Sequence, residues 1–169
     1  TLEDMTAETP YSERRWAMLI GALHAAGRRR DALLAYRQID RMLREDIGID
    51  PGPELRAAEL RVLVAPGRNG GFIAHGIEID YVATADTEEA VRQRFAEGFI
   101  ATVRSLIRRG RPLDSLFASR APASAIAAYF ASEKHDVFFC AIGEALPDLP
   151  KGSAIPRHLA FVSAPSLAA

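Results

Sequence analysis

A chain of 169 residues, 49% of them apolar and 25% charged, has the size and composition of one ordinary globular domain or two small ones. The net charge of −1 provides no global basic field that would draw it onto nucleic acid or a membrane. The composition excludes a disordered or collagen-like chain, and the single cysteine, Cys140, excludes a disulfide-stapled one. The sequence has no long apolar run and no signal peptide, so we expect a cytoplasmic protein that does not span a membrane.

The first part of the chain carries apolar side chains at helical spacing. Positions i, i+3, i+4 and i+7 of a first helix are Trp16, Leu19, Ile20 and Leu23. Gly27 and the three arginines after it predict a tight turn, and we expect Asp31 to cap the next helix. The buried face of that helix is predicted to hold Leu33, Tyr36, Ile39 or Asp40, and Leu43.

Glycines and prolines between Gly48 and Pro53 end the second helix, because proline lacks the donor that a helix interior requires. A third helix is expected from Glu54 to Val64, with Leu55, Leu60 and Leu63 buried. Residues 1–66 then form an antiparallel helical hairpin and a further helix, as in a tetratricopeptide unit. The Gly-rich residues 67–71 are the strongest break in the sequence, and we expect them to link two domains, 1–66 and 72–169.

The second part opens with a strand pattern. Ile77, Ile79 and Tyr81 alternate with Glu78 and Asp80, which predicts one buried and one solvated face. A helix is expected from Asp86 or Thr87 to about Arg109, with an apolar stripe at Val91, Phe95, Phe99, Val103 and Ile107.

The remaining elements are shorter. We expect a helix over 122–132, a buried segment over 137–142 that is a strand or a helix, and mostly loop from Pro147 on, with a short strand at 159–162. The fold class predicted for the whole chain is α+β: a helical hairpin module followed by a small α/β domain, with a short antiparallel sheet and one long helix.

Four segments of residues 8–65 carry a family resemblance. They are Tyr11–Trp16, Ala22–Arg28, Asp31–Tyr36 and Leu43–Leu55, and the run Gly-Ile-Asp-Pro-Gly-Pro-Glu-Leu over 48–55 is the most specific part. Together they resemble the bacterial transcriptional activator domain, the tetratricopeptide-like module of antibiotic-pathway regulators. The resemblance implies transcriptional regulation through a protein partner or self-association. DNA binding in that family belongs to a preceding winged helix, which this sequence lacks, and since it opens at Thr1 we expect it to be part of a longer polypeptide.

Residues 72–131 resemble HicB-type antitoxins in three segments: 72–78, 86–90 and 113–122. Those relatives usually have one more strand before the position of Phe72, where this sequence has the Gly-rich stretch. We therefore expect either a short sheet or a strand supplied from elsewhere, and a sheet edge left open there would invite pairing with a second copy. The resemblance implies the alternative function, an antitoxin-like binder that dimerises or masks a small nuclease.

The candidate partner-binding residues are two aromatic side chains and two arginine clusters. Trp16 and Tyr36 are interpreted as core anchors that could also line a groove between the helices. The arginines are Arg28, Arg29 and Arg30 in the turn, and Arg104 and Arg108 one turn apart on the long helix, beside Arg109 and Arg111. A solvated, charge-balanced face is favoured for both clusters over phosphate contacts.

The histidines and the cysteine do not form a catalytic pattern. Alternation places His75 on the face opposite Glu78 and Asp80, and His24 is expected on a helix surface. His135 has no nucleophile in a recognisable frame, and Cys140 is expected to be a buried filler. We therefore expect neither an enzyme nor a cofactor or metal site.

Overall fold

The structure is a computed structural model, and it describes residues 6, 8–132, 137–150, 153 and 155–164. The chain divides into two compact units, the helical unit Thr1–Glu59 and the sheet unit Leu60–Ala169. This division lies before residues 67–71, which the sequence predicted to be a linker between domains. Residues 67–71 instead form the turn between two paired strands of the sheet unit.

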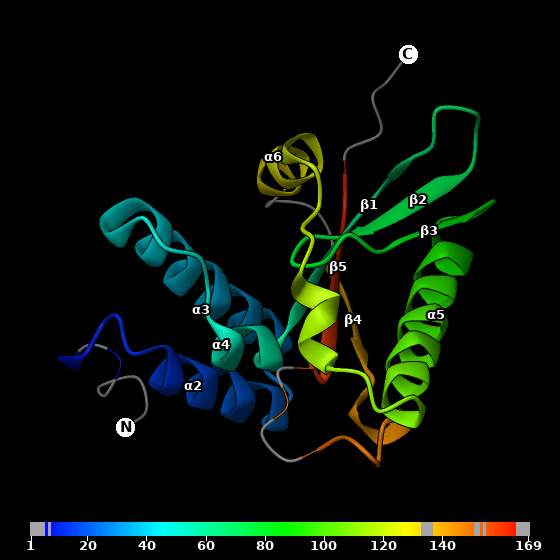
Figure 1. Ribbon diagram of the computed structural model, residues 1–169. Helices are drawn as coiled ribbons and strands as arrows, with labels where there is room; N and C mark the ends of the chain where they lie inside the picture. Colours follow the sequence, from blue (N-terminus) through cyan, green and yellow to red (C-terminus); the bar gives the residue numbers. More distant parts are fainter. Residues whose placement is uncertain (1–5, 7, 133–136, 151–152, 154, 165–169) are drawn as a thin grey trace. The chain divides into compact units, whose positions relative to one another are not determined.

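In the part that the structure describes, the helical unit contains a hairpin of two antiparallel helices followed by a short helix (Figure 1). These described elements are α2 (Glu13–Ala25), α3 (Arg29–Met42), the π-helical turn η1 (Leu43–Ile47) and α4 (Pro53–Ala58). Gly27 and Gly48, with φ of 74° and 75°, end α2 and η1 in the left-handed region that favours glycine.

The predicted faces of both long helices are confirmed, because Trp16, Leu19, Ile20 and Leu23 pack with Tyr36, Ile39 and Leu43 in one buried cluster. Two details of the prediction are wrong. Arg28, not Asp31, occupies the N-cap of α3, and Asp31 lies in the first turn. The third helix ends at Ala58, and Leu60 and Leu63 belong to a strand.

The sheet unit contains a five-stranded mixed sheet in the order β3-β2-β1-β5-β4. The strands are β1 (Leu60–Pro66), β2 (Phe72–Gly76), β3 (Val82–Ala85), β4 (Val137–Ala141) and β5 (His158–Ser163). Neighbouring strands pair antiparallel except β1 and β5, which run parallel. The expectation of a short antiparallel sheet is therefore wrong for the β1–β5 pair, which makes the sheet mixed.

Strand β1 occupies residues that the sequence pattern had assigned to the end of the third helix. Its first five residues are all buried, because layers pack on both faces of a central strand. Apolar residues at four of these five positions do not distinguish a strand from a helix. β1 also supplies the strand before Phe72, so the edge expected to be open if no such strand existed is paired. β5, expected as a short strand in a loop, lies inside the sheet between β1 and β4.

Helices cover the two faces of the sheet (Figure 1). α5 (Glu88–Arg108) packs on β1, β2 and β3, as its predicted apolar stripe requires, and Thr87 caps it by accepting a hydrogen bond from the Ala90 N–H at 3.1 Å. α6 (Ala123–Ala131) contacts β1 through a separate cluster that includes Tyr129, Leu63 and Val162. Two 3₁₀ turns, η2 (Leu113–Phe117) and η3 (Gly143–Ala145), complete the unit.

The strand predicted through Tyr81 is interrupted after Gly76. The Gly76 N–H donates to the Tyr81 carbonyl, and the chain turns between β2 and β3. Alternation therefore fails beyond this point. Glu78, predicted on the solvated face, is buried, and His75 Nε2 lies 3.1 Å from Asp80 Oδ1 although the two were placed on opposite faces.

Candidate partner-binding groove of the helical unit

A groove of about 440 Å³ runs along the hairpin of the helical unit. Its apolar lining comes from both long helices: Trp16, Leu19 and Leu23 on α2, and Leu34, Ala35 and Met42 on α3. Gln38, Thr6 and Pro10 also line it, and Arg28 and Asp31 lie at the turn between the helices. The groove is therefore an apolar surface with a charged pair near the hairpin turn.

Trp16 is fixed at the groove by a hydrogen bond. Its indole Nε1–H donates to the Pro10 carbonyl at 2.7 Å, so the polar atom of this buried ring is satisfied. Tyr36 is fully buried in the core and does not line the groove. The structure thus brings only one of the two predicted aromatic residues to the candidate site.

Leu34 was not among the predicted binding residues. Its side chain is 54% exposed although it lines the groove. The sequence signal was the pair Leu33-Leu34, because two adjacent apolar residues of a helix cannot both face the same core. Leu33 is buried, and Leu34 is left on the open side.

The first arginine cluster is divided. Arg28 Nε donates to Asp31 Oδ2 at 2.7 Å, an i, i+3 ion pair that lines the groove. Arg29 and Arg30 are exposed and do not line it. Only Arg28 of the three is placed to contact a ligand in the groove.

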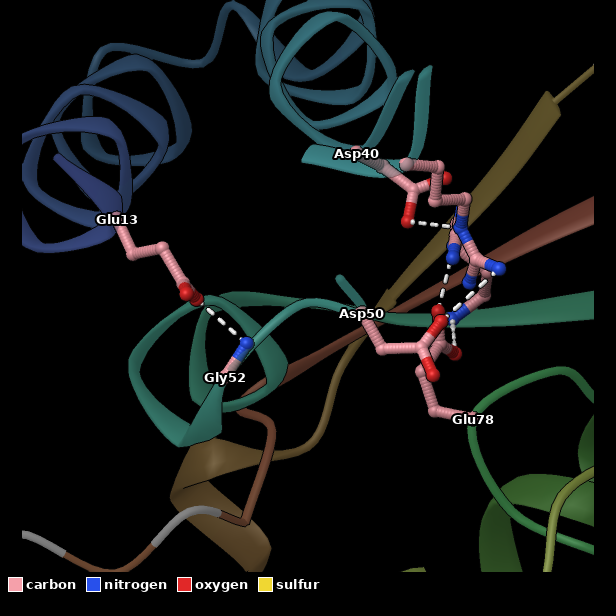
Figure 2. A network of polar contacts seen from close by, with 7 residues as sticks. Glu13, Asp40, Asp50, Gly52 and Glu78 are labelled. Carbon is pink, nitrogen blue, oxygen red and sulfur yellow. Dashed lines mark hydrogen bonds and ion pairs between the residues drawn. The ribbon is translucent and has the colours of Figure 1, made fainter. Parts of the chain in front are cut away.

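Polar contacts hold the loop after α3 against the two helices (Figure 2). Arg44 forms ion pairs of 3.0 Å with the buried Asp40 and with Asp50, and Glu13 Oε2 accepts the Gly52 N–H at 2.5 Å. Asp50 and Gly52 belong to the run over 48–55 that carried the resemblance. This run therefore anchors the loop to α2 and α3, the two walls of the groove.

His24 differs from its prediction as a helix-surface residue. Its side chain is 3% exposed, and Nε2 lies 3.1 Å from Oε2 of the fully buried Glu59. The pair joins the end of α2 to the last residue of the helical unit. This contact stabilises the helical unit, and neither residue lines the groove.

The second arginine cluster lies on α5, in the sheet unit. Arg104 donates to the Ala145 carbonyl at 2.7 Å. Arg104 and Arg108 line a small cavity of about 150 Å³ together with Asp148, whose carboxylate lowers the local positive charge. Neither residue belongs to the groove of the helical unit.

The other titratable candidates are dispersed. Cys140 is half-buried rather than buried, and desolvation raises the pKa of its thiol, which disfavours the reactive thiolate. His135 lies outside the described residues. Among the residues that the structure does describe, no three His, Cys, Asp or Glu side chains gather closely enough to hold a metal ion, and no helix is long and apolar enough to cross a membrane.

Comparison with known proteins finds similarity in the first part of the chain. Residues 1–63 match the family Bacterial transcriptional activator domain. The transcriptional regulatory protein EmbR of Mycobacterium tuberculosis is 50% identical over 62 residues, which are 37% of this chain and 16% of EmbR. The regulatory protein AfsR of Streptomyces griseus is 41% identical over 64 residues, 38% of this chain and 7% of AfsR.

The regulatory protein DnrI of Streptomyces peucetius is 36% identical over 72 residues, 41% of this chain and 26% of DnrI. The chain therefore spans about a quarter or less of the length of these relatives. The expected HicB-like character of residues 72–131 is not supported by the comparisons. No solved structure gives a significant match to the chain.

Proposed function

We propose that the helical unit acts in transcriptional regulation by binding another polypeptide along its groove. The observation that carries the proposal is the match of residues 1–63 to the activator domain shared with three proteins named as regulators. A groove with an apolar lining from both long helices is a surface suited to contact with another polypeptide.

The groove fits an amphipathic helix. Its lining residues Leu34 and Met42 and the ring of Trp16 offer apolar area, and helix-in-groove recognition places apolar side chains of the partner at i, i+3 and i+4 against such a surface. The Arg28–Asp31 pair at the turn can orient polar groups of the partner without adding net charge. The partner is a helix of another regulatory protein or of a second copy.

Chromosomal alleles in the organism that encodes the protein would test this proposal. Leu34→Asp places a charge in the groove, and Met18→Asp is the matched control, because Met18 is 50% exposed and lies outside the groove. RNA sequencing compares both alleles with the wild type and with a strain that lacks the gene, and circular dichroism of the purified variants verifies their folding.

We expect Leu34→Asp to reproduce the transcriptional changes of the deletion while Met18→Asp resembles the wild type. A Leu34→Asp strain with an unchanged transcript profile would overturn the binding role of the groove. A deletion strain with an unchanged profile would overturn the regulatory function itself.

A further inference from the structure

A second hollow, of about 720 Å³, lies along the C-terminal half of α5. It is lined by Ala101, Thr102, Ser105, Leu106, Arg109 and Arg111. The first five of these residues lie on one face of the helix. Ala101, Ser105 and Arg109 follow one another at intervals of four residues, and so do Thr102 and Leu106. Its volume is within the range of about 300–1,000 Å³ typical of small-molecule sites.

The end of α5 brings Arg111 back to this face. Gly110, with φ of 60°, turns the chain, and the Arg111 N–H donates to the Leu106 carbonyl while the Gly110 N–H donates to the Ile107 carbonyl, both at 3.0 Å. This is the hydrogen-bond pattern of a Schellman motif. Arg109 and Arg111 therefore line the same hollow from either side of the glycine.

The positive charge of the hollow is not neutralised. Arg109 and Arg111 are exposed, no ion pair joins either of them to another residue in the described part of the chain, and no acidic residue lines the hollow. The neighbouring cavity on α5 differs, because Asp148 lines it with Arg104 and Arg108.

The helix dipole does not account for this arrangement. A cation near the C-terminus of a helix interacts favourably with the free carbonyls of the last turn, and Arg108 already occupies that turn. The carbonyls of Ser105, Leu106 and Ile107 accept backbone N–H groups, so they repel an anion less than open carbonyls would. Arg111 lies beyond the helix and faces the hollow instead.

We propose that this hollow binds the phosphate group of a phosphorylated small molecule. Two guanidinium groups offer the planar, forked donors that match phosphate oxygens, and the Ser105 hydroxyl adds a donor on the helix face. Leu106 and Ala101 give the apolar area on which the body of the ligand rests. The sheet unit would then carry an effector site of its own, in addition to the groove proposed for the helical unit.

Titration of the isotope-labelled chain with inorganic phosphate, followed by two-dimensional NMR of its amide and arginine side-chain signals, tests the site. Sodium chloride at equal ionic strength is the reference. The variants are Arg109→Gln and Arg111→Gln, both at exposed positions, and the charge-matched controls are Arg29→Gln and Arg30→Gln in the helical unit. Adenosine monophosphate against adenosine measures the contribution of the ligand body, and a phosphoserine peptide represents a protein ligand.

We expect saturable shifts centred on Ser105, Arg109, Gly110 and Arg111, tighter binding of adenosine monophosphate than of phosphate, and none with adenosine. Each Gln variant at the hollow should weaken binding about tenfold or more, since a charge-assisted hydrogen-bond pair is lost, while the controls bind as the wild type does.

Absent or non-saturating shifts, shifts spread equally over all arginines, or unchanged binding in Arg109→Gln and Arg111→Gln would overturn the proposal. Preference for the phosphoserine peptide over the small molecules would overturn the assignment to a small ligand. These outcomes are independent of the groove test, because the Leu34 and Met18 alleles leave this hollow intact.

Discussion

Breaking the buried ion pair between Arg61 and Glu78 is expected to destabilise the sheet unit strongly. Arg61 is fully buried and the Glu78 side chain is 4% exposed. Glu78 Oε1 accepts the Arg61 Nε–H at 2.5 Å, and Oε2 accepts the backbone N–H of Arg61 at 3.0 Å. The Arg61 guanidinium also lies over the rings of Tyr129 and Phe130, at 5.5 and 5.6 Å from their centroids. The pair thus connects β1, the β2–β3 turn and α6.

Removal of one partner leaves a buried charge without its counter-ion. We therefore expect Glu78→Gln and Arg61→Met each to lower the free energy of unfolding by about 3–5 kcal/mol. For a domain of this size the melting temperature changes by roughly 4 °C per kcal/mol, so the expected decrease is roughly 12–20 °C. The double variant Arg61→Met/Glu78→Leu should lose less than the two single variants added together, because neither charge remains buried.

Urea and thermal unfolding followed by far-ultraviolet circular dichroism would measure these changes. Arg68→Met, which removes an exposed arginine of the β1–β2 turn, is the control and should change stability by less than about 0.5 kcal/mol. A loss below about 1 kcal/mol for Glu78→Gln, or strict additivity in the double variant, would refute the argument that burial makes this pair costly to break.

Three further predictions concern local chemistry. A Cβ at Gly98 would overlap the Tyr81 hydroxyl, so Gly98→Ala should cost about 1–3 kcal/mol in urea unfolding, and Tyr81→Phe should relieve part of that cost; a neutral Gly98→Ala would contradict the close packing. Because burial raises the pKa of the Cys140 thiol, iodoacetamide should alkylate it more slowly at neutral pH than a free cysteine, with a rate that keeps rising at pH values where free cysteine has levelled off; equal profiles would count against this. The charge of Asp46 raises the pKa of Tyr11, so Asp46→Asn should lower that pKa in an ultraviolet absorbance titration, and an unchanged titration would show that the 3.2 Å contact is not formed in solution.

Local periodicity was sufficient for the helices. The spacing of Trp16 and Leu23 on α2, and of Phe95 and Phe99 on α5, predicted which faces are buried, because a helix repeats every 3.6 residues wherever it packs. The resemblance carried by the run over 48–55 agrees with the match of residues 1–63 to the bacterial transcriptional activator domain.

Periodicity was insufficient where a neighbour from elsewhere in the chain decides the environment. Leu60–Val64 reads equally well as a helix or a strand, and only pairing with β2 and β5 makes it the centre of the sheet. The candidate groove was predicted in part: Trp16 and Arg28 line it, whereas Leu34 was missed because its exposure depends on what α3 packs against.

The sequence by itself determined the buried faces of the long helices α2, α3 and α5, because these depend on residues a few positions apart. It also carried the resemblance of its first part to the activator domain. The tertiary structure alone decided the mixed sheet, the burial of Glu78 beside Arg61, and the position of Arg111 over the face of α5. Each of these features depends on where the chain turns and on which strands then pair. The physical reason is that a backbone turn changes the direction of the side chains that follow it, although their spacing in the sequence stays the same.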